Sequence, residues 1–352
     1  MNKFISYTRK WLVGTCSLTA LLWFTSCEKF FDYEGDCDPH YFVSFIYDMN
    51  MEGADSFDKQ VSSVDLFIFD AATGRFVDHY AEKGEPLKQK GYLMPIYVDP
   101  GEYEFVAWCG LANNEGSYSI PDINQISTIE DLNAVLARKY DAQNKAYSNA
   151  NLNFNSNSEP CALYHGKIAA SLPDVQGKHY YEVPLTRDTN NLIVSIWHHF
   201  GDLSEDHYEF SLVYTDESNA TMGYNNLPLA DEDISYRPWS TESGILDMGA
   251  RAETGSGSRY NYIKAEIAMG RLLEGQRPRL IIRDTDAGEV RLDIDFLYYV
   301  EMMRSANYAK MGNQEYFDRQ YEYSLVVILD TTWTGFQLVV NGWHVIEGDS
   351  HL

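Results

Sequence analysis

The chain has 352 residues, of which 52 are Asp or Glu and only 27 are Lys or Arg, so its formal net charge is −25. A surface this acidic repels nucleic acid and anionic lipid, which excludes a nucleic-acid partner and a basic patch as a membrane contact. Tyrosine occurs 26 times, and β-branched residues lie in short alternating runs, which favours a mostly β protein.

The first 26 residues have the composition of a secretory signal. Lys3, Arg9 and Lys10 form a basic start, and an almost wholly apolar run extends from Trp11 to Phe24. This run is shorter than the roughly 20 residues that span a bilayer, so we do not expect a retained transmembrane helix. Without residues 1–26 the chain has 24 basic and 52 acidic residues, a net charge of −28.

The end of the apolar run resembles the lipobox of bacterial lipoproteins, although Phe24 replaces the usual aliphatic residue. The resemblance implies cleavage between Ser26 and Cys27, followed by attachment of lipid to the sulfur and amino group of Cys27. Several acyl chains, each worth about 0.8 kcal/mol per buried methylene, hold a protein stably in a membrane. The alternative is an ordinary secretory signal in which Cys27 is incidental. We expect no cofactor other than this covalent lipid.

The next part of the chain predicts an acidic tether at residues 27–40 and an N-terminal β-sandwich at residues 41–186. Pro95 within one predicted strand indicates an edge position or a bulge. Ser127 and Glu130 predict a capping box for a helix with Leu132, Val135 and Leu136 on one side. The Asn- and Ser-rich stretch from Gln143 to Pro160 predicts a long exposed loop. The predicted strands are Tyr41–Tyr47, Val64–Phe69, Tyr92–Val98, Tyr103–Ala107, Ala162–Gly166 and Tyr180–Leu185.

Residues 187–352 predict a second β-sandwich, interrupted by a helix near Leu297–Ala309. Turns are expected at Asp286–Gly288 and Asp330–Gly335. No alternation of helices and strands recurs, which excludes a doubly wound α/β fold and leaves two all-β sandwiches with small helical insertions. The predicted strands are Leu192–Trp197, Tyr208–Tyr214, Ile263–Met269, Leu280–Arg283, Val290–Ile294, Tyr323–Leu329, Phe336–Val340 and Asn341–Ile346.

No residue pattern indicates an enzyme. His198 and His199 are adjacent in a strand, so their rings point to opposite faces and do not form one metal site. The acids of the 284–295 hairpin lack the order of a calcium loop, and solvated turn acids are the simpler interpretation. Five tryptophans are candidates for a sugar-binding platform, but their dispersal along alternating strands favours core packing: Trp108, Trp197, Trp239, Trp333 and Trp343.

The remaining cysteines do not form a metal or redox motif. Cys37, Cys109 and Cys161 are widely spaced, and no C-x-x-C pair exists. Either one disulfide with a free thiol or three buried thiols are compatible with this pattern.

Several stretches, in this order, resemble the fimbrillin-associated anchor family, the FimB-like minor fimbrial subunits of anaerobic Gram-negative bacteria. Beside the lipobox, they are Val43–Asn50, Ala54–Phe57, Val64–Asp70, Pro100–Trp108, Leu163–Gly166, Leu185–Asn190, Gly270–Leu272, Gln314–Gln320 and Val340–Trp343. The resemblance implies two transthyretin-like (Greek-key) β-sandwiches, no catalysis, and a place at the base of a fimbrium. By the same resemblance, members of the family hold the fimbrium to the outer membrane and limit the length of the fimbrium.

The resemblance also implies how such a subunit differs from a stalk subunit. Stalk subunits lose their lipid and first strand by cleavage after a basic residue, usually Arg, and the open groove takes a strand from the next subunit. Here only Lys29 and Lys59 are basic between Cys27 and Val61, and the first Arg is Arg75. We therefore expect the first strand, with Tyr41, Val43, Phe45 and Tyr47 on one face, to be retained. The expected location is the outer membrane, facing the cell exterior.

The strand offered to the fimbrial stalk subunit is expected in the C-terminal segment Phe336–Ile346. Its candidate inward side chains are Phe336, Leu338, Val340 and Trp343. The alternative is that this segment stays in its own sheet as an edge hairpin. Two further functions stay open: a surface lipoprotein that binds glycans or host ligands, and a tip or stalk fimbrial subunit.

Overall fold

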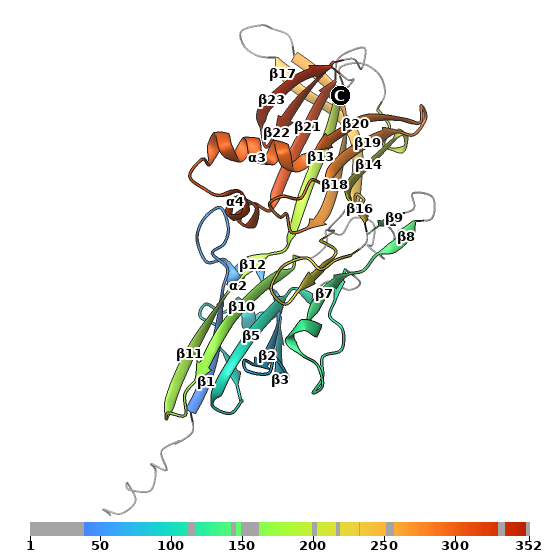
Figure 1. The fold of residues 1–352 in the computed structure, drawn as a ribbon. Coiled ribbons are helices and arrows are strands. Elements are labelled where there is room, and N and C mark those ends of the chain that lie inside the picture. Colours follow the sequence, from blue (N-terminus) through green and yellow to red (C-terminus); the bar gives the residue numbers. More distant parts are fainter. Residues whose placement is uncertain are drawn as a thin grey trace, which may run out of the picture.

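The protein consists of two β-sandwiches stacked end to end along its long axis (Figure 1). The computed structural model describes residues 39–111, 117–141, 146–148, 162–198, 203–215, 219–231, 233–250, 257–329 and 335–349. The predicted mainly β fold with two sandwiches and small helical insertions is confirmed. The signal segment, the tether before residue 39 and the 330–334 turn lie outside the described residues.

The N-terminal sandwich packs a three-stranded sheet against a five-stranded sheet. The smaller sheet has the order β11 (Gly177–Pro184), β1 (Pro39–Ile46), β4 (Met94–Ile96). The larger has the order β12 (Thr186–Arg187), β10 (Tyr164–Leu172), β5 (Gly101–Cys109), β2 (Ser63–Asp70), β3 (Phe76–Lys83). Pro95 lies in the edge strand β4, as predicted, where its missing N–H costs no interior ladder bond.

The five-stranded sheet is buried on both faces, which explains the nearly continuous apolar sequence of β2. Leu66 and Ile68 face β1, whereas Phe67 and Phe69 face a layer that contains residues 118–136 and 221–223. This layer is a small sheet with the order β15 (Thr221–Gly223), β7 (Asn133–Leu136), β6 (Tyr118–Ser119).

The predicted capped helix in this layer is wrong. The capping box forms one residue later, between Thr128 and Asp131, and caps only the 3-10 turn Ile129–Asp131. The chain then continues as strand β7, in which Ala134 and Leu136 alternate inward onto the five-stranded sheet. Pairing with β15 and period-two burial prevail over the local helix signal.

The C-terminal sandwich packs two six-stranded sheets. The first has the order β17 (Ser240–Ala250), β18 (Gly257–Gly270), β13 (Thr189–His198), β21 (Glu322–Leu329), β22 (Gly335–Val340), β23 (Trp343–Asp349). The second has the order β20 (Glu289–Asp295), β19 (Arg279–Asp284), β14 (Tyr208–Tyr214), β16 (Ile234–Tyr236), β9 (Ala146–Ser148), β8 (Lys139–Asp141). The strands β8 and β9 precede residue 186, yet they extend a sheet whose other strands all follow it.

Among the described residues, α-helices are few and short. The longest is α3 (Phe296–Asn307), which confirms the predicted helix and begins where the Asp295 carboxylate accepts a hydrogen bond from the Tyr298 N–H at 3.0 Å. The others are α2 (Phe57–Gln60) and α4 (Asn313–Arg319). Figure 1 shows α3 and α4 beside the C-terminal sandwich, near β21 and β22. Within the described residues, no helix is long and apolar enough to cross a membrane.

Candidate functional site

The first strand β1 occupies the centre of its sheet. It pairs in parallel with β11 along all eight residues and antiparallel with β4 over three. The predicted inward residues Tyr41, Val43, Phe45 and Tyr47 are 2%, 0%, 5% and 0% exposed. Loss of β1 would therefore leave two unpaired edges and an apolar trough, the combination that accepts an incoming strand.

Polar contacts hold both ends of β1 in register. At its start, the Tyr41 hydroxyl donates to the Pro173 carbonyl at 2.8 Å. Directly after its end, the Tyr47 N–H donates to the Asp55 carboxylate at 3.0 Å. The Tyr47 ring meets Tyr164 edge-on at 4.9 Å, and burial raises the pKa of the Tyr47 phenol. The strand is part of the core from end to end.

The C-terminal hairpin β22–β23 has a different environment. It lies at the edge of its sheet, so β23 is paired on one side only within the part of the chain that the structure describes. Asn341 and Gly342 turn the chain with φ of 46° and 83°, and the Asn341 side-chain oxygen accepts a hydrogen bond from the Ser324 N–H at 2.6 Å. Leu338 and Val340 are fully buried in the core.

Phe336 and Trp343, the other two candidate donor residues, lie in β22 and β23, but their side-chain surroundings fall outside the described part of the chain. The structure thus places the predicted donor segment in its own sheet as an edge hairpin. Its donation to another subunit stays a prediction.

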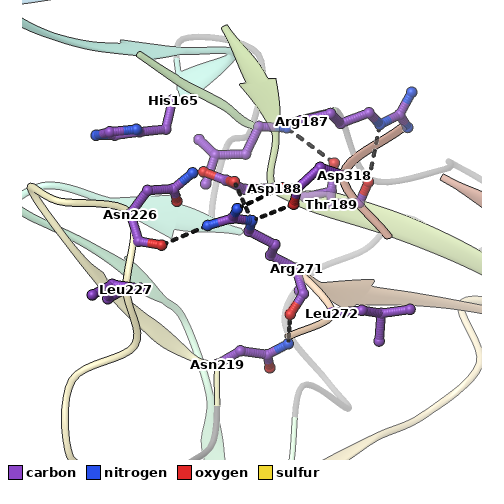
Figure 2. A network of polar contacts seen from close by, with 12 residues as sticks. His165, Arg187, Asp188, Thr189, Asn219, Asn226, Leu227, Arg271, Leu272 and Asp318 are labelled. Atoms are coloured by element: carbon purple, nitrogen blue, oxygen red, sulfur yellow. Dashed lines mark hydrogen bonds and ion pairs between the residues drawn. The ribbon is translucent and has the colours of Figure 1, made fainter. Parts of the chain in front are cut away.

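A buried polar network joins the two sandwiches, with Arg271 at its centre (Figure 2). Arg271 follows β18 and donates from Nε and Nη2 to the two oxygens of Asp318 at 2.8 and 2.9 Å. Its Nη1 donates to the Asn226 carbonyl at 2.7 Å. Asp188, between β12 and β13, lies 3.9 Å from the same guanidinium. One cation therefore links the connection between the sandwiches to helix α4 and to the loop after β15.

Asp188 is the most deeply buried member of this network. Its side chain is completely buried, and the nearest cation, Arg271, lies 3.9 Å away, beyond hydrogen-bond distance. Burial raises its pKa to about 7, although Arg271 acts to lower it. Nearby, burial lowers the pKa of His165 to about 4, so this ring is neutral, and its Nε2 lies 2.9 Å from the Tyr224 carbonyl oxygen.

Most of the sequence stretches that carry the family resemblance meet at this junction. Asp188, Arg271 and Asp318 belong to the 185–190, 270–272 and 314–320 stretches, and His165 to the 163–166 stretch. Arg319 connects the Val43–Asn50 stretch to this junction, because its guanidinium donates to the carbonyls of Asp48 and Asn50 at 3.2 and 3.1 Å. Sequence reasoning missed this network, although a lone Arg between Gly270 and Leu272 was a signal for it.

The other candidate residues do not form a site. Within the described residues, no group of His, Cys, Asp or Glu could hold a metal ion. Asp284 pairs with Arg291, Asp293 pairs with Arg279, and Asp295 caps α3, while Asp286 lies 3.4 Å from His207. His198 is buried, and His199 lies outside the described residues.

The tryptophans and cysteines add no site. Trp108 is fully buried and meets His165 edge-on, which confirms core packing for this residue, while Trp197 packs against Tyr260. Trp333 lies outside the described residues, and so do Cys27, Cys37 and Cys161. Cys109 is a buried free thiol, which is compatible with either predicted cysteine arrangement.

Comparison with known proteins identifies the family. The sequence model of the fimbrillin-A associated anchor proteins Mfa1 and Mfa2 matches residues 33–349. The chain belongs to this family. Its membership assigns the protein a role in fimbriae and agrees with a structural, non-enzymatic protein. No curated protein matches the chain.

Solved structures show the same fold. A candidate adhesin from Bacteroides thetaiotaomicron is 27% identical with a TM-score of 0.72, covering 89% of this chain and 99% of that one. A candidate polysaccharide-binding protein from the same species is 28% identical with a TM-score of 0.68, covering 88% and 98%. The fimbrial anchor protein Mfa2 from Porphyromonas gingivalis is 16% identical with a TM-score of 0.62, covering 89% and 100%.

Proposed function

We propose that this protein is the base subunit of a fimbrium, anchored in the outer membrane by lipid on Cys27, and that it ends subunit assembly there. Family membership supports the anchor role. The observation that carries the terminator role is the position of β1, paired on both sides with four inward side chains in the core. A subunit that keeps this strand has no groove for a further subunit.

The positions of basic residues support retention of β1. Between Cys27 and Val61 the only Lys or Arg residues are Lys29 and Lys59, and the first arginine after Cys27 is Arg75. Arg75 lies in the turn between β2 and β3 and forms an isolated bridge with Thr128. Cleavage there would remove β2 as well as β1, and β2 pairs with both β3 and β5 inside the larger sheet. An Arg-specific protease therefore has no site that removes only the first strand.

The contact with the fimbrial stalk subunit is proposed at the C-terminal hairpin, through addition of a strand. In one mode, the hairpin opens and donates Phe336–Ile346, which withdraws Leu338 and Val340 from the core. In the other mode, the hairpin stays closed and the free edge of β23 pairs with the stalk subunit. Both modes place the partner at the edge of the C-terminal sandwich, and β1 takes no part in them.

Mass spectrometry of the N-terminus of the native protein tests the anchor and terminator roles. We expect an acylated Cys27 as the first residue and an intact segment through Tyr47. The variant Cys27→Ala should release fimbriae from the cells. An acyl-free mature form that begins beyond Tyr47 would make this protein a stalk subunit.

Two truncations test the stalk contact. A chain ending at Asn341 lacks only β23, and a chain ending at Gly335 lacks both strands of the hairpin. We expect the shorter chain to be lipidated and folded in its N-terminal sandwich, yet to lose the fimbrium. Attachment that survives both truncations would place the contact elsewhere.

A further inference from the structure

We propose that a pocket between helices α3 and α4 and the six-stranded sheet that contains β13 and β21 is a binding site for a neutral saccharide. The pocket has a volume of about 680 Å³, within the range of about 300–1,000 Å³ typical of small-molecule sites. It lies on the C-terminal sandwich, beside β21 and the β22–β23 turn. This inference goes beyond the anchor role and does not depend on it.

The pocket has a rigid aromatic wall. Tyr316 and Tyr323 are each 1% exposed and form its floor, whereas Tyr308 at its rim is 40% exposed. The Tyr308 ring packs against Tyr316 with centroids 5.3 Å apart. The Tyr323 hydroxyl donates to the Gln320 carbonyl at 2.8 Å, which fixes the floor to the end of α4. The partly exposed Tyr308 ring is therefore held in place as a stacking surface for the apolar face of a sugar ring.

The polar groups around the Tyr308 ring can accept hydrogen bonds from the hydroxyl groups of a ligand. Asn307 uses its Nδ2 to bond the Met303 carbonyl at 3.1 Å, which leaves its side-chain oxygen to accept a hydrogen bond. Glu322, an exposed residue, adds a carboxylate whose two oxygens can accept further hydrogen bonds. None of the described lining residues is Lys, Arg or His, so the pocket has no partner for a phosphate, sulfate or acidic sugar. A neutral ligand rich in hydroxyl donors fits this chemistry.

A second hollow provides room for a longer ligand. It measures about 180 Å³, shares Gln320 and Glu322 with the first, and continues toward Asn50 and Ser56 of the N-terminal sandwich. Arg319 lines it, but its guanidinium is neutralised by Glu315 at 3.0 Å and hydrogen-bonded to backbone carbonyls. An oligosaccharide of a few residues fits better than a single sugar.

The same geometry argues against a peptide strand as the ligand. The β21 residues of the pocket pair with the interior strand β13, the Ser324 N–H donates to the Asn341 side-chain oxygen, and the Glu322 carbonyl accepts a hydrogen bond from Gln320 Nε2. These backbone groups are therefore not available for strand addition. The site borders the hairpin turn at Asn341 but lies away from the outer edge of β23.

The test uses the whole mature protein and an array of neutral oligosaccharides ending in glucose, galactose, mannose or N-acetylhexosamine, followed by calorimetry with each one that binds. Tyr308→Ala should weaken binding about tenfold, because it removes the stacking surface. Tyr308→Phe keeps the ring and should retain the affinity. Tyr298→Ala is the matched control, since Tyr298 lies on α3 and is 52% exposed but does not line the pocket.

Three results would overturn the proposal. The first is an array on which the folded wild-type protein binds no neutral oligosaccharide. The second is equal affinity of the Tyr308→Ala and Tyr298→Ala variants. The third is a Tyr308→Phe variant that unfolds at the wild-type thermal midpoint and yet fails to bind. Fimbrial anchoring should be unchanged in every variant, which separates this test from that of the anchor role.

Discussion

The strand at the start of the described chain and the hairpin at its end make opposite use of similar sequences. Both have alternating apolar residues, and Val43 in β1 and Leu338 in β22 are each 0% exposed. However, β1 has a paired neighbour on each side, whereas β23 has one neighbour among the described residues and lies at the edge of its sheet. Backbone pairing therefore separates the two ends.

This difference has a direct consequence for assembly. An unpaired strand edge is a template for another chain, and an interior strand is not. In the proposed role, retention of β1 closes the N-terminal sandwich to further subunits, while the C-terminal sandwich keeps an edge that can be extended. The proposal thus predicts that a fimbrium grows from this subunit in one direction only. The predictions below test this asymmetry at each end and at the junction between them.

Removal of β1 should have the largest effect. A chain that begins at Asp48 loses four buried side chains, each worth about 1.5–3 kcal/mol, together with the pairing to β11 and β4. This loss is comparable to the whole stability of a domain, so we expect the N-terminal sandwich to unfold. Hydrogen exchange of β2 and β5 measures the effect.

The control for this deletion is a chain that begins at Pro39, which should exchange like the full protein. A synthetic peptide of residues 39–47 should restore protection to the shorter chain. Normal protection without the peptide would show that β1 is dispensable, and the asymmetry between the two ends would then be lost.

Substitution of Arg271 should destabilise the junction between the two sandwiches. Arg271→Ala leaves the buried carboxylates of Asp188 and Asp318 without their cation, a change that typically costs about 3–5 kcal/mol. Arg279→Ala is the matched control, because Arg279 pairs with Asp293 at 2.8 Å on the exposed surface, where a pair is worth about 0–1 kcal/mol. Equal unfolding free energies of the two variants by urea titration would contradict a central role for the Arg271 network.

Strands whose burial follows one simple period could be predicted from the sequence. The alternation in β1 and β21 was sufficient. The Asp286–Gly288 turn was also correctly predicted, and Gly288 adopts φ of 68° there. The strand β3 was missed because Asp78 occupies one of its half-buried positions, which weakens the apolar alternation. The strand β7 was predicted as a helix because its pairing partner β15 lies more than 80 residues away in sequence.

The junction could not be predicted from the chain alone. Asp188, Arg271 and Asp318 are distant in sequence, and each resembles an ordinary surface charge until the sandwiches bring them together. The saccharide pocket was missed for the same reason, since its residues come from two helices, two strands and a turn. Pairing across long sequence separations decides both features, and local periodicity contains no information on it.

The ionisation of Asp188 should make the junction sensitive to pH. Its pKa is about 7 in the folded chain against 3.8 for the unperturbed group, so the unfolded state loses this proton first as the pH rises. The free energy of unfolding should therefore fall between about pH 4 and pH 7, by an amount on the order of 4 kcal/mol, and then level off. Asp188→Asn should remove this part of the pH dependence.

Denaturant titrations at pH 5 and pH 8 measure this change. Asp293→Asn, which removes an exposed carboxylate in an ion pair with Arg279, is the control and should preserve the wild-type difference between the two pH values. An unchanged pH dependence in Asp188→Asn would show that its carboxyl titrates normally and that the junction tolerates its charge.

Destabilising the turn of the C-terminal hairpin should have the smallest effect on stability, yet it distinguishes the two modes of stalk binding. Gly342 has φ of 83°, so Gly342→Ala costs about 1–2 kcal/mol, whereas Gly342→Asn is better tolerated there. Hydrogen exchange of β22 and β23 should become about 5–30 times faster in the Ala variant. If the hairpin opens to donate its strand, this variant should capture stalk subunits more readily. If the edge of β23 in the closed hairpin is the binding surface, capture should weaken instead, because the closed hairpin is populated less. Equal exchange in the Ala and Asn variants would show that the turn does not control the hairpin.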